Sequence, residues 1–310
     1  MGSGVTDFAV IGSESFSGRA FCEHLRYRAI SWAGFSRKTG HDVRRPATII
    51  DQIAEQRIPY VVNFAALNMV AESWHYAGDY YRTNVEGVAS LADGLRESGI
   101  RRFVQVSTPE VYGTQHTALR EGAPYGPSTP YAVSRAAADM HLSACQRAWG
   151  FPVCFTRTVN VYGPGQQLYR IVPKAIMCAM TGRKLQLHGG GFSERSFVHI
   201  NDVADGIFSV AIDGADGATY HMATPRMISI RALVMMICEM MGVSFGDLVD
   251  EVEDRPGKDH AYLLDDSKIR DTLGWRDVVN LEDGISEVIA WTRKHRTELE
   301  VMSLDYEHRP

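Results

Sequence analysis

Several features that mark whole classes of protein are missing from this 310-residue sequence. Its cysteines are scattered and form no Cys-x-x-Cys pair, which argues against a disulfide framework and favours reduced thiols in the cytoplasm. The histidines do not stand in pairs at metal-ligand spacing, so no metal site is expected. No apolar run approaches the roughly 18 residues of a membrane helix, and the first residues do not resemble a signal peptide.

The charge pattern is equally plain. The net charge is -5, and no block of lysine or arginine is long enough to suggest nucleic acid or an anionic membrane as a partner. Apolar residues make up 45% of the chain and charged residues 22%, which is ordinary for a globular protein able to bury one large core or two smaller ones. We therefore expect a cytoplasmic protein that acts on a small molecule.

The stretch that follows residue 102 gathers polar side chains after a strand. An alternating, β-branched run over 103–106 predicts a buried strand. Ser107, Thr108 and Glu110 follow at its carboxyl end, where open α/β sheets bind their ligands. Taken alone, this segment is equally typical of a helix start, with a hydroxyl cap and an acid in the first turn.

A helix is predicted to begin shortly afterwards. Thr129 suits an N-cap, and Pro130 suits the first helical position. Tyr131 and Arg135 then lie four residues apart, on one face of this helix. A hydroxyl, a carboxylate, a phenol and a fixed cation are thus supplied by two neighbouring elements. The combination indicates a site, although a lone tyrosine is more often a packed aromatic residue.

The beginning of the chain predicts a dinucleotide-binding unit. A short apolar strand over 7–11 is followed by the turn GSESFSG, with Gly12, Ser15 and Gly18 at the spaced positions, and then by a helix over 19–28. Such a turn points backbone N–H groups and a helix N-terminus toward a pyrophosphate. Because Ser15 replaces the middle glycine, a turn that binds nothing is the alternative.

The tip of the second strand, predicted over 29–35, bears on the choice of cofactor. It ends in Ser36, Arg37 and Lys38 and carries no acid. An acid there would bind the ribose 2′-hydroxyl of NAD, whereas arginine accommodates the 2′-phosphate of NADP. We therefore favour NADP, with NAD as the second option and a solvated loop as the alternative interpretation of the two cations.

Strands and helices alternate through the first half of the chain. Further strands are predicted over 60–66 and 151–158 and helices over 46–56 and 78–98, which together favour an α/β fold with a doubly wound parallel sheet of the Rossmann type. Beyond residue 165 the pattern loosens into shorter elements, as in an interleaved substrate-binding region. The polar residues 299–310 are expected to fray.

At this point the motifs resemble a known family. In order, they are GSESFSG, VVNFAA, YYRTNVEG, STPEVYG, PYAVSRAAAD, NVYGPGQ, RSFVHINDVADGI and RPGKDHAYLLDDSKIRDTLGW. The chain is similar to the extended short-chain dehydrogenase/reductases that act on nucleotide sugars, and most of all to the 4,6-dehydratase branch that includes the dTDP-glucose and GDP-mannose dehydratases. The resemblance covers the chain from Phe8 to about Trp291.

The resemblance implies roles for individual residues. Tyr131 matches the catalytic base, Arg135 stands where the family usually has lysine, Thr108 matches the hydroxyl that binds the sugar 4-OH, and Glu110 matches the base at C5. Cofactor contacts are expected, partly from the strand ends and partly from the resemblance, at Gly12, Ser15, Phe16, Gly18, Ser36, Arg37, Asp42, Val43, Ala65, Ala66, Ser107, Tyr131 and Arg135. Substrate contacts are expected at Asn160, Gln166, Arg195, Arg255 and His260.

The resemblance also implies an organisation and a reaction. Residues 1–165, with a returning segment at about 196–225, would form the Rossmann domain, and residues 166–195 and 226–310 the substrate-binding region. Helices such as 78–98 and 131–148 would build a homodimer. The enzyme would oxidise C4 of a nucleotide-diphosphate hexose, eliminate water across C5 and C6, and return hydride to give the 4-keto-6-deoxy sugar, with a tightly bound, recycled cofactor.

Two departures from the family pattern keep other outcomes open. Pro109 stands where many dehydratases have an aspartate that protonates the leaving hydroxyl, and Arg135 replaces lysine. The alternatives on the same scaffold are a 4-epimerase, a hexuronate decarboxylase and a 5,6-dehydratase. A non-catalytic sensor that binds NAD(P) is the alternative of a different class.

Overall fold

The computed structural model describes residues 6–113, 117–253 and 263–308. Within these ranges six strands form one parallel sheet in the order β2-β1-β3-β4-β5-β9. The order reverses between β1 and β3, which creates the switch point where doubly wound sheets bind ligands. The predicted α/β fold with a doubly wound parallel sheet is confirmed. The strands are β1 (Phe8–Ile11), β2 (Trp32–Phe35), β3 (Tyr60–Asn63), β4 (Arg102–Val106), β5 (Val153–Thr158) and β9 (Thr219–Met222).

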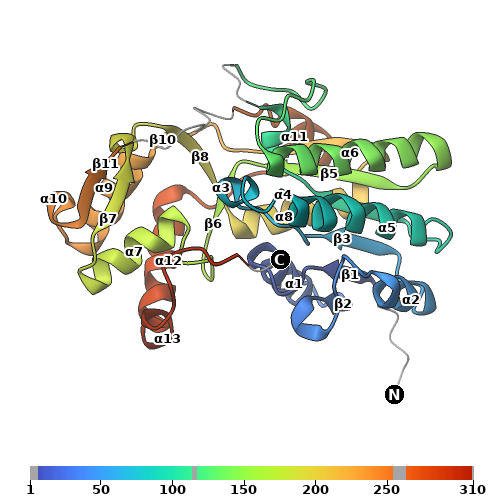
Figure 1. The fold of residues 1–310 in the computed structure, drawn as a ribbon, viewed down its shortest axis with the longest axis horizontal. Helices are drawn as coiled ribbons and strands as arrows, with labels where there is room; N and C mark the ends of the chain where they lie inside the picture. The colour runs from blue at the N-terminus through green and yellow to red at the C-terminus, as the bar shows by residue number, and fades with distance from the viewer. Residues whose placement is uncertain (1–5, 114–116, 254–262, 309–310) are drawn as a thin grey trace.

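Helices cover both faces of this sheet (Figure 1). Successive side chains of β1 point to opposite faces, so Val10 packs on one side and Ile11 on the other. Strands buried on both faces read as continuous apolar runs, which is why β1 is so easily recognised in the sequence. One face is covered by α1 (Phe16–Tyr27), α8 (Ile200–Asp213) and α11 (Ser267–Leu273), the other by α2 (Ala47–Glu55), α5 (Gly87–Gly94) and α6 (Pro130–Trp149).

The predicted helix over 78–98 is present but interrupted and shorter. It comprises α4 (Ala77–Tyr81), a π-helical turn (Arg82–Glu86) and α5, and it follows the short α3 (Val70–Ser73). Within the π-turn, Asn84 exchanges two hydrogen bonds of 2.9 Å with the backbone of Leu67 and donates a third to Ser134. This buried amide fixes the loop after β3 against α6.

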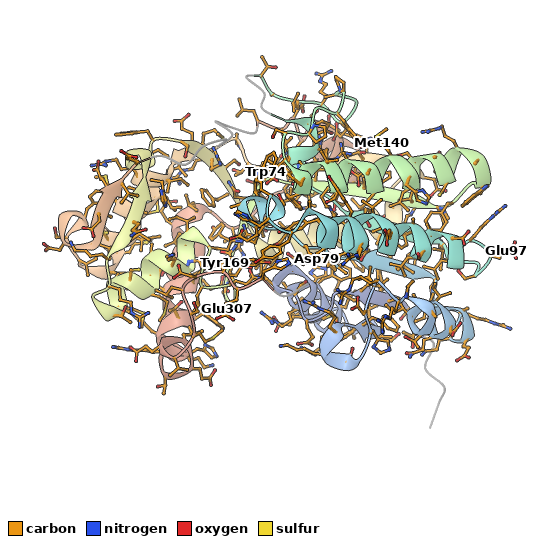
Figure 2. The ribbon with its side chains drawn as sticks, in the orientation of Figure 1. Trp74, Asp79, Glu97, Met140, Tyr169 and Glu307 are labelled. Carbon is orange, nitrogen blue, oxygen red and sulfur yellow. The ribbon has the colours of Figure 1, made fainter. Side chains whose placement is uncertain are left out.

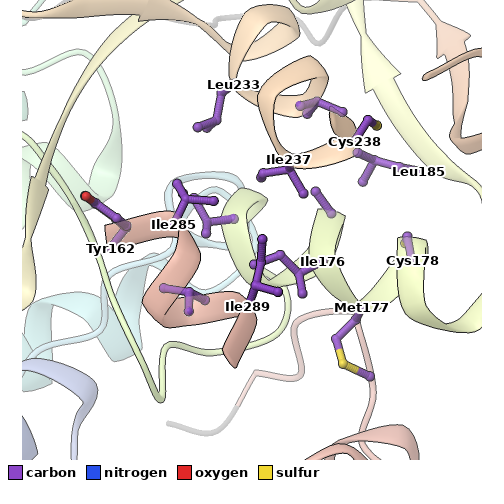
Figure 3. Packing of buried hydrophobic residues seen from close by; sticks show 14 of the residues in the cluster. Tyr162, Ile176, Met177, Cys178, Leu185, Leu233, Ile237, Cys238, Ile285 and Ile289 are labelled. Carbon is purple, nitrogen blue, oxygen red and sulfur yellow. The ribbon is translucent and has the colours of Figure 1, made fainter. Parts of the chain in front are cut away.

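A second hydrophobic core lies to the side of the sheet. Ile176 of α7 and Ile285 and Ile289 of α12 meet Ile237 of α9 in this core (Figure 3). Two small sheets, β10-β8-β6 and β11-β7, flank these helices. The elements are β6 (Asn160–Tyr162), α7 (Ile171–Thr181), β7 (Leu185–His188), β8 (Glu194–His199), β10 (Met227–Ser229), α9 (Ile230–Met241), α10 (Phe245–Leu248), β11 (Val249–Val252), α12 (Leu281–Lys294) and α13 (Arg296–Glu300).

The expectation that the end of the chain frays is wrong as far as residue 308. Leu304 is buried, and the ring of His308 stacks on Tyr76 with centroids 4.0 Å apart. The Nε2 atom of His308 is 3.2 Å from an Asp79 carboxylate oxygen. Figure 2 shows Asp79 and Glu307 where the two parts of the molecule meet. A polar composition did not reveal these contacts because their partners lie more than two hundred residues away in the chain.

Within the described ranges, no helix combines the length and the apolar character needed to cross a membrane.

Candidate active site

The turn after β1 closes tightly against its neighbours. Gly12 has φ of +79°, and a β-carbon there would lie 2.8 Å from the backbone nitrogen of Ala65. A β-carbon at Gly18 would collide with the carbonyl oxygen of Gly12. Ser15 caps α1 by accepting a hydrogen bond of 3.0 Å from the Gly18 N–H. Only glycines permit this close approach, which leaves a backbone cradle below the N-terminus of α1.

This turn lines a cleft between the ends of β1, β2 and β3, here called the first cleft. Eight residues predicted to contact a cofactor line it, namely Gly12, Ser15, Ser36, Arg37, Asp42, Val43, Ala65 and Ala66. Gly18 lies beneath the cradle and does not line the cleft. The small side chains at 65 and 66 leave the backbone of the β3 end accessible. The site therefore fits an extended dinucleotide, whose pyrophosphate would lie on the α1 terminus.

The far end of the first cleft is rich in cations. Arg37, Lys38 and Arg44 line it. Hydrogen bonds from Arg44, the shortest 2.6 Å, hold the Asp42 carboxylate and keep its pKa below the usual value. Asp42 is therefore an ionised acceptor already engaged by Arg44. Arg37 and Lys38 are the exposed cations at the tip of β2.

A second cleft continues from the first and shares Ser15, Phe64 and Ala66 with it. All four predicted catalytic residues, Thr108, Glu110, Tyr131 and Arg135, line this second cleft. Phe16 and Ser107 line it as well, as do Asn160, Gln166 and Arg195 among the predicted substrate contacts. Arg255 and His260 lie outside the described residues. The fold thus brings together side chains from positions 15 to 195.

The segment after β4 is both a helix start and part of the cleft. Thr108 caps the 3₁₀ turn Pro109–Tyr112, called η3, and accepts a hydrogen bond of 3.3 Å from the Glu110 N–H. The two interpretations of Thr108-Pro109-Glu110 are therefore compatible. The cap fixes the turn, and the turn presents Glu110 to the second cleft.

The α6 helix delivers the phenol and the cation as the sequence predicts. Thr129 caps it by accepting a hydrogen bond of 3.2 Å from Ala132, with Pro130 at the first position. Tyr131 and Arg135 are both buried, and Arg135 donates a hydrogen bond to the carbonyl oxygen of Val106 at the end of β4. The guanidinium therefore ties the helix to the strand beside it.

Burial governs the acidity of the Tyr131 phenol. It raises the pKa of Tyr131 to about 12, and the negative charge of Glu110 adds to the effect. Arg135, a hydrogen bond with Thr108, and Arg170 act in the opposite direction. The phenol therefore carries its proton at neutral pH, and the cations beside it reduce the cost of removing that proton.

Arg170 is a candidate site residue that sequence reasoning missed. It precedes α7, lines the second cleft, and donates a hydrogen bond of 3.3 Å to Asn68 on the opposite wall. Its location four residues after Gln166, just before a helix, is the only signal the sequence offers. That signal does not say which way the chain turns after the GPGQ segment.

Comparison with known proteins identifies the family of this chain. A sequence model described as the NAD dependent epimerase/dehydratase family matches residues 8–223. The chain belongs to this family. A dTDP-glucose 4,6-dehydratase of Streptomyces griseus is 37% identical over 238 residues, which span 76% of this chain and 72% of that protein.

Solved structures of other family members share the fold. A dTDP-glucose 4,6-dehydratase from Streptomyces venezuelae with NAD bound superimposes with a TM-score of 0.88 at 29% identity, over 95% of this chain and 99% of that one. A UDP-glucose 4-epimerase from Thermotoga maritima has the same TM-score of 0.88 at 22% identity, over 94% and 100% of the two chains. The fold alone therefore does not distinguish the reactions within the epimerase/dehydratase family.

Proposed function

We propose that the protein is a nucleotide-sugar 4,6-dehydratase that converts a nucleotide-diphosphate hexose into the 4-keto-6-deoxy sugar and water. The observation that carries this proposal is Glu110, the only carboxylic acid among the described residues that line the second cleft. It shares that cleft with Tyr131, Thr108 and Arg135. Elimination of water needs a base that removes the C5 proton, and a carboxylate beside the other proton-transfer residues can be that base. Simple inversion at C4 needs no such base.

The first cleft is the proposed binding site of a nicotinamide dinucleotide. The glycine cradle and the α1 terminus suit a dinucleotide, and the second cleft begins where its nicotinamide end would lie. When bound, the nicotinamide supplies the redox capacity of the cycle, in which C4 is oxidised, C6 is reduced and no external reductant is consumed.

Tyr131 and its neighbours manage the proton of the sugar 4-hydroxyl. Thr108 holds that hydroxyl near the phenol, since Thr108 and Tyr131 are themselves hydrogen-bonded. The charge of Arg135 favours the phenolate that accepts the proton. Arginine retains its own proton throughout, so it supplies charge and not a proton relay.

Glu110 handles the protons of the elimination step. Once C4 is a ketone, the C5 hydrogen is acidic and Glu110 removes it while the C6 hydroxyl departs. Pro109, the neighbour in the turn, has no proton to donate. We propose that Glu110, protonated by C5, then protonates the departing hydroxyl, so that one carboxyl group serves both purposes.

The basic side chains of the second cleft suit the diphosphate of the substrate. Arg195 and Arg170 enter from separate elements of the substrate-binding region, which we take to comprise residues 166–195 and 226–310. Asn160 and Gln166 line the same part of the cleft, and Gln166 is held by a hydrogen bond of 2.7 Å to the Val161 carbonyl oxygen. Two fixed cations complement the charge of a diphosphate.

NADP is the proposed form of the cofactor. No acid directly follows β2, and Ser36 caps a short turn that exposes Arg37 and Lys38, where they could meet the 2′-phosphate of a bound NADP. We also propose a homodimer through α4, α5 and α6, since Met140 of α6 and Tyr81 of α4 are large apolar side chains exposed on these helices. The buried free thiols suit the cytoplasm.

Mass spectrometry of the purified protein with a panel of dTDP-, UDP-, GDP- and CDP-hexoses tests the proposal. A product lighter by one water, formed catalytically without added reductant, would support it and identify the nucleotide. Deuterium placed at C4 should appear at C6, because return of the label to C4 indicates a 5,6-dehydratase instead. A product of unchanged mass but inverted C4, or no product from any sugar, would refute the proposal.

A further inference from the structure

A buried ion pair lies behind the turn that carries Glu110. Arg157 of β5 and Asp139 of α6 are both fully buried, with Nη2 and Oδ2 2.9 Å apart. Burial disfavours the charged guanidinium, but the Asp139 carboxylate together with the hydroxyls of Tyr112 and Tyr125 outweighs burial, so the pKa of Arg157 is raised and the arginine stays charged. Neither residue lines the first or the second cleft. The ion pair therefore does not contact a cofactor or sugar bound in these clefts, and any influence on the reaction must pass through neighbouring residues.

The ion pair is bonded to both ends of η3. Asp139 Oδ2 also accepts a hydrogen bond of 2.6 Å from the hydroxyl of Ser107, just before the turn. Arg157 donates to the hydroxyl of Tyr112, the last residue of the turn, and its guanidinium lies 4.6 Å from the centre of the Tyr112 ring. Glu110 is thus held in a short segment whose two ends meet the same pair of charges.

A neutral histidine completes the support of Tyr112. The Tyr112 hydroxyl lies 2.8 Å from Nε2 of His221, and Nδ1 of that ring lies 3.1 Å from the Asp265 carbonyl oxygen. Burial, aided by the charge of Arg157, lowers the pKa of His221 to about 4, so the ring is neutral near pH 7. Nδ1–H then donates to Asp265, and Nε2 accepts from Tyr112. The Tyr112 hydroxyl is thus hydrogen-bonded to both Arg157 and His221.

We propose that Asp139, Arg157 and Tyr112 form a positioning network that holds Glu110 at the distance needed for proton transfer at C5. The inference rests on the role proposed above for Glu110. Proton transfer requires the base within hydrogen-bond reach of the proton, so displacement of η3 by a fraction of a bond length weakens elimination. Oxidation at C4 depends on Tyr131 of α6 and on Thr108 at the start of the turn, whereas Tyr112 anchors the end beyond Glu110, so its release should affect elimination more than oxidation.

Two tyrosines on the same arginine provide a matched pair of variants. Arg157 donates to the hydroxyl of Tyr125 as it does to that of Tyr112, and the ring of Tyr125 lies 4.9 Å from the guanidinium. Tyr125 belongs to the loop before α6 and not to η3. Tyr112→Phe and Tyr125→Phe each remove one hydroxyl from Arg157 and keep the ring, but only the first releases the turn.

The decisive experiment measures both chemical steps in single turnovers. Borodeuteride trapping and mass spectrometry would separate the 4-keto-hexose from the product that has lost water. Tyr112→Phe should slow loss of water by about 10- to 100-fold, while formation of the 4-keto-hexose changes by less than about twofold. Tyr125→Phe should leave both rates within about twofold of the unsubstituted protein. Equal losses in both steps, or equal behaviour of the two variants, would overturn the proposal.

Amide hydrogen exchange gives a readout that does not depend on turnover. Peptides that span 109–113 should exchange faster in Tyr112→Phe than in Tyr125→Phe, and unchanged exchange would overturn the anchoring. If the unsubstituted protein dehydrates no sugar, the proposed function fails, yet the exchange comparison still decides whether the network holds η3. Should Tyr112→Phe fail to fold, Ser107→Ala releases the other end of the turn and is expected to accelerate the same exchange.

Discussion

The guanidinium of Arg135 donates a hydrogen bond to the carbonyl oxygen of Val106 while its charge eases ionisation of Tyr131 one helical turn away. A single buried side chain thus fixes α6 to β4 and lowers the cost of forming the phenolate. The first function depends on the geometry of arginine, and the second only on a positive charge.

These two functions predict different outcomes for two substitutions. Arg135→Lys keeps the charge, so turnover should stay within about tenfold of that of the unsubstituted protein. A tenfold change corresponds to a shift of about one unit in the pKa of Tyr131. Arg135→Met removes the charge and should lower turnover about a hundredfold or more. Because the charge lowers the pKa of Tyr131, its loss should shift the rising limb of the pH–rate profile to higher pH. A profile that does not move in Arg135→Met would contradict this role of the cation.

Glu110 is predicted to act after oxidation and not before it. Glu110→Gln should form the 4-keto-hexose but slow the loss of water about 10²- to 10⁴-fold, since the amide cannot accept the C5 proton. The Glu110 charge raises the pKa of Tyr131, so its removal should not impair oxidation. Trapped 4-keto-hexose and dehydrated product are measured by mass spectrometry. Formation of the dehydrated product at the normal rate would place the C5 base elsewhere.

The tip of β2 is predicted to discriminate between the two cofactors. Arg37→Ala should weaken binding of NADP by about 10- to 100-fold, the value of a charge-assisted hydrogen bond, with little effect on NAD. Isothermal titration with each cofactor measures the ratio. Lys38→Ala removes the neighbouring cation, so it separates a specific contact of Arg37 from a general attraction to positive charge. Equal weakening of both cofactors by Arg37→Ala would argue for NAD.

The strand ends could be predicted from the sequence because their signal is local. Buried parallel strands are short apolar runs, and the residues after them, such as Gly12 and Ser107, must lie at one edge of the sheet. The cap of α6 is similarly local, since Thr129 and Pro130 specify where Tyr131 and Arg135 begin their helix.

The contacts that join distant elements could not be predicted in this way. In the sequence, Arg157 is a polar residue in an apolar strand and Asp139 is a polar residue in a helix. Nothing in either segment predicts that the two side chains form an ion pair. Arg170 meets Asn68 only because the chain turns back across the cleft after β6. The final segment packs against the rest of the protein because the ring of His308 stacks on that of Tyr76. A hydropathy scale does not measure such aromatic stacking.

Two buried histidines predict a loss of stability in acid. Burial lowers the pKa of His199 and of His221 to about 4, from 6.5 in the unfolded chain. Glu287 lies 3.4 Å from Nε2 of His199, but its side chain is half exposed and does not offset burial. Above pH 6.5 both rings are neutral in the folded and in the unfolded chain, so protonation of these histidines does not reduce the free energy of unfolding. As the pH falls toward 4, only the unfolded chain binds protons, and stability falls.

The expected loss between these two pH values is on the order of a few kcal/mol, measured as a fall in the melting temperature. His199→Asn keeps an acceptor for the Asn201 N–H, which His199 now caps at 3.4 Å, but it cannot titrate. The variant should therefore show a flatter dependence of melting temperature on pH below 6.5, whatever its stability at pH 7. An unchanged slope would mean that His199 is charged in the folded protein, stabilised by Glu287.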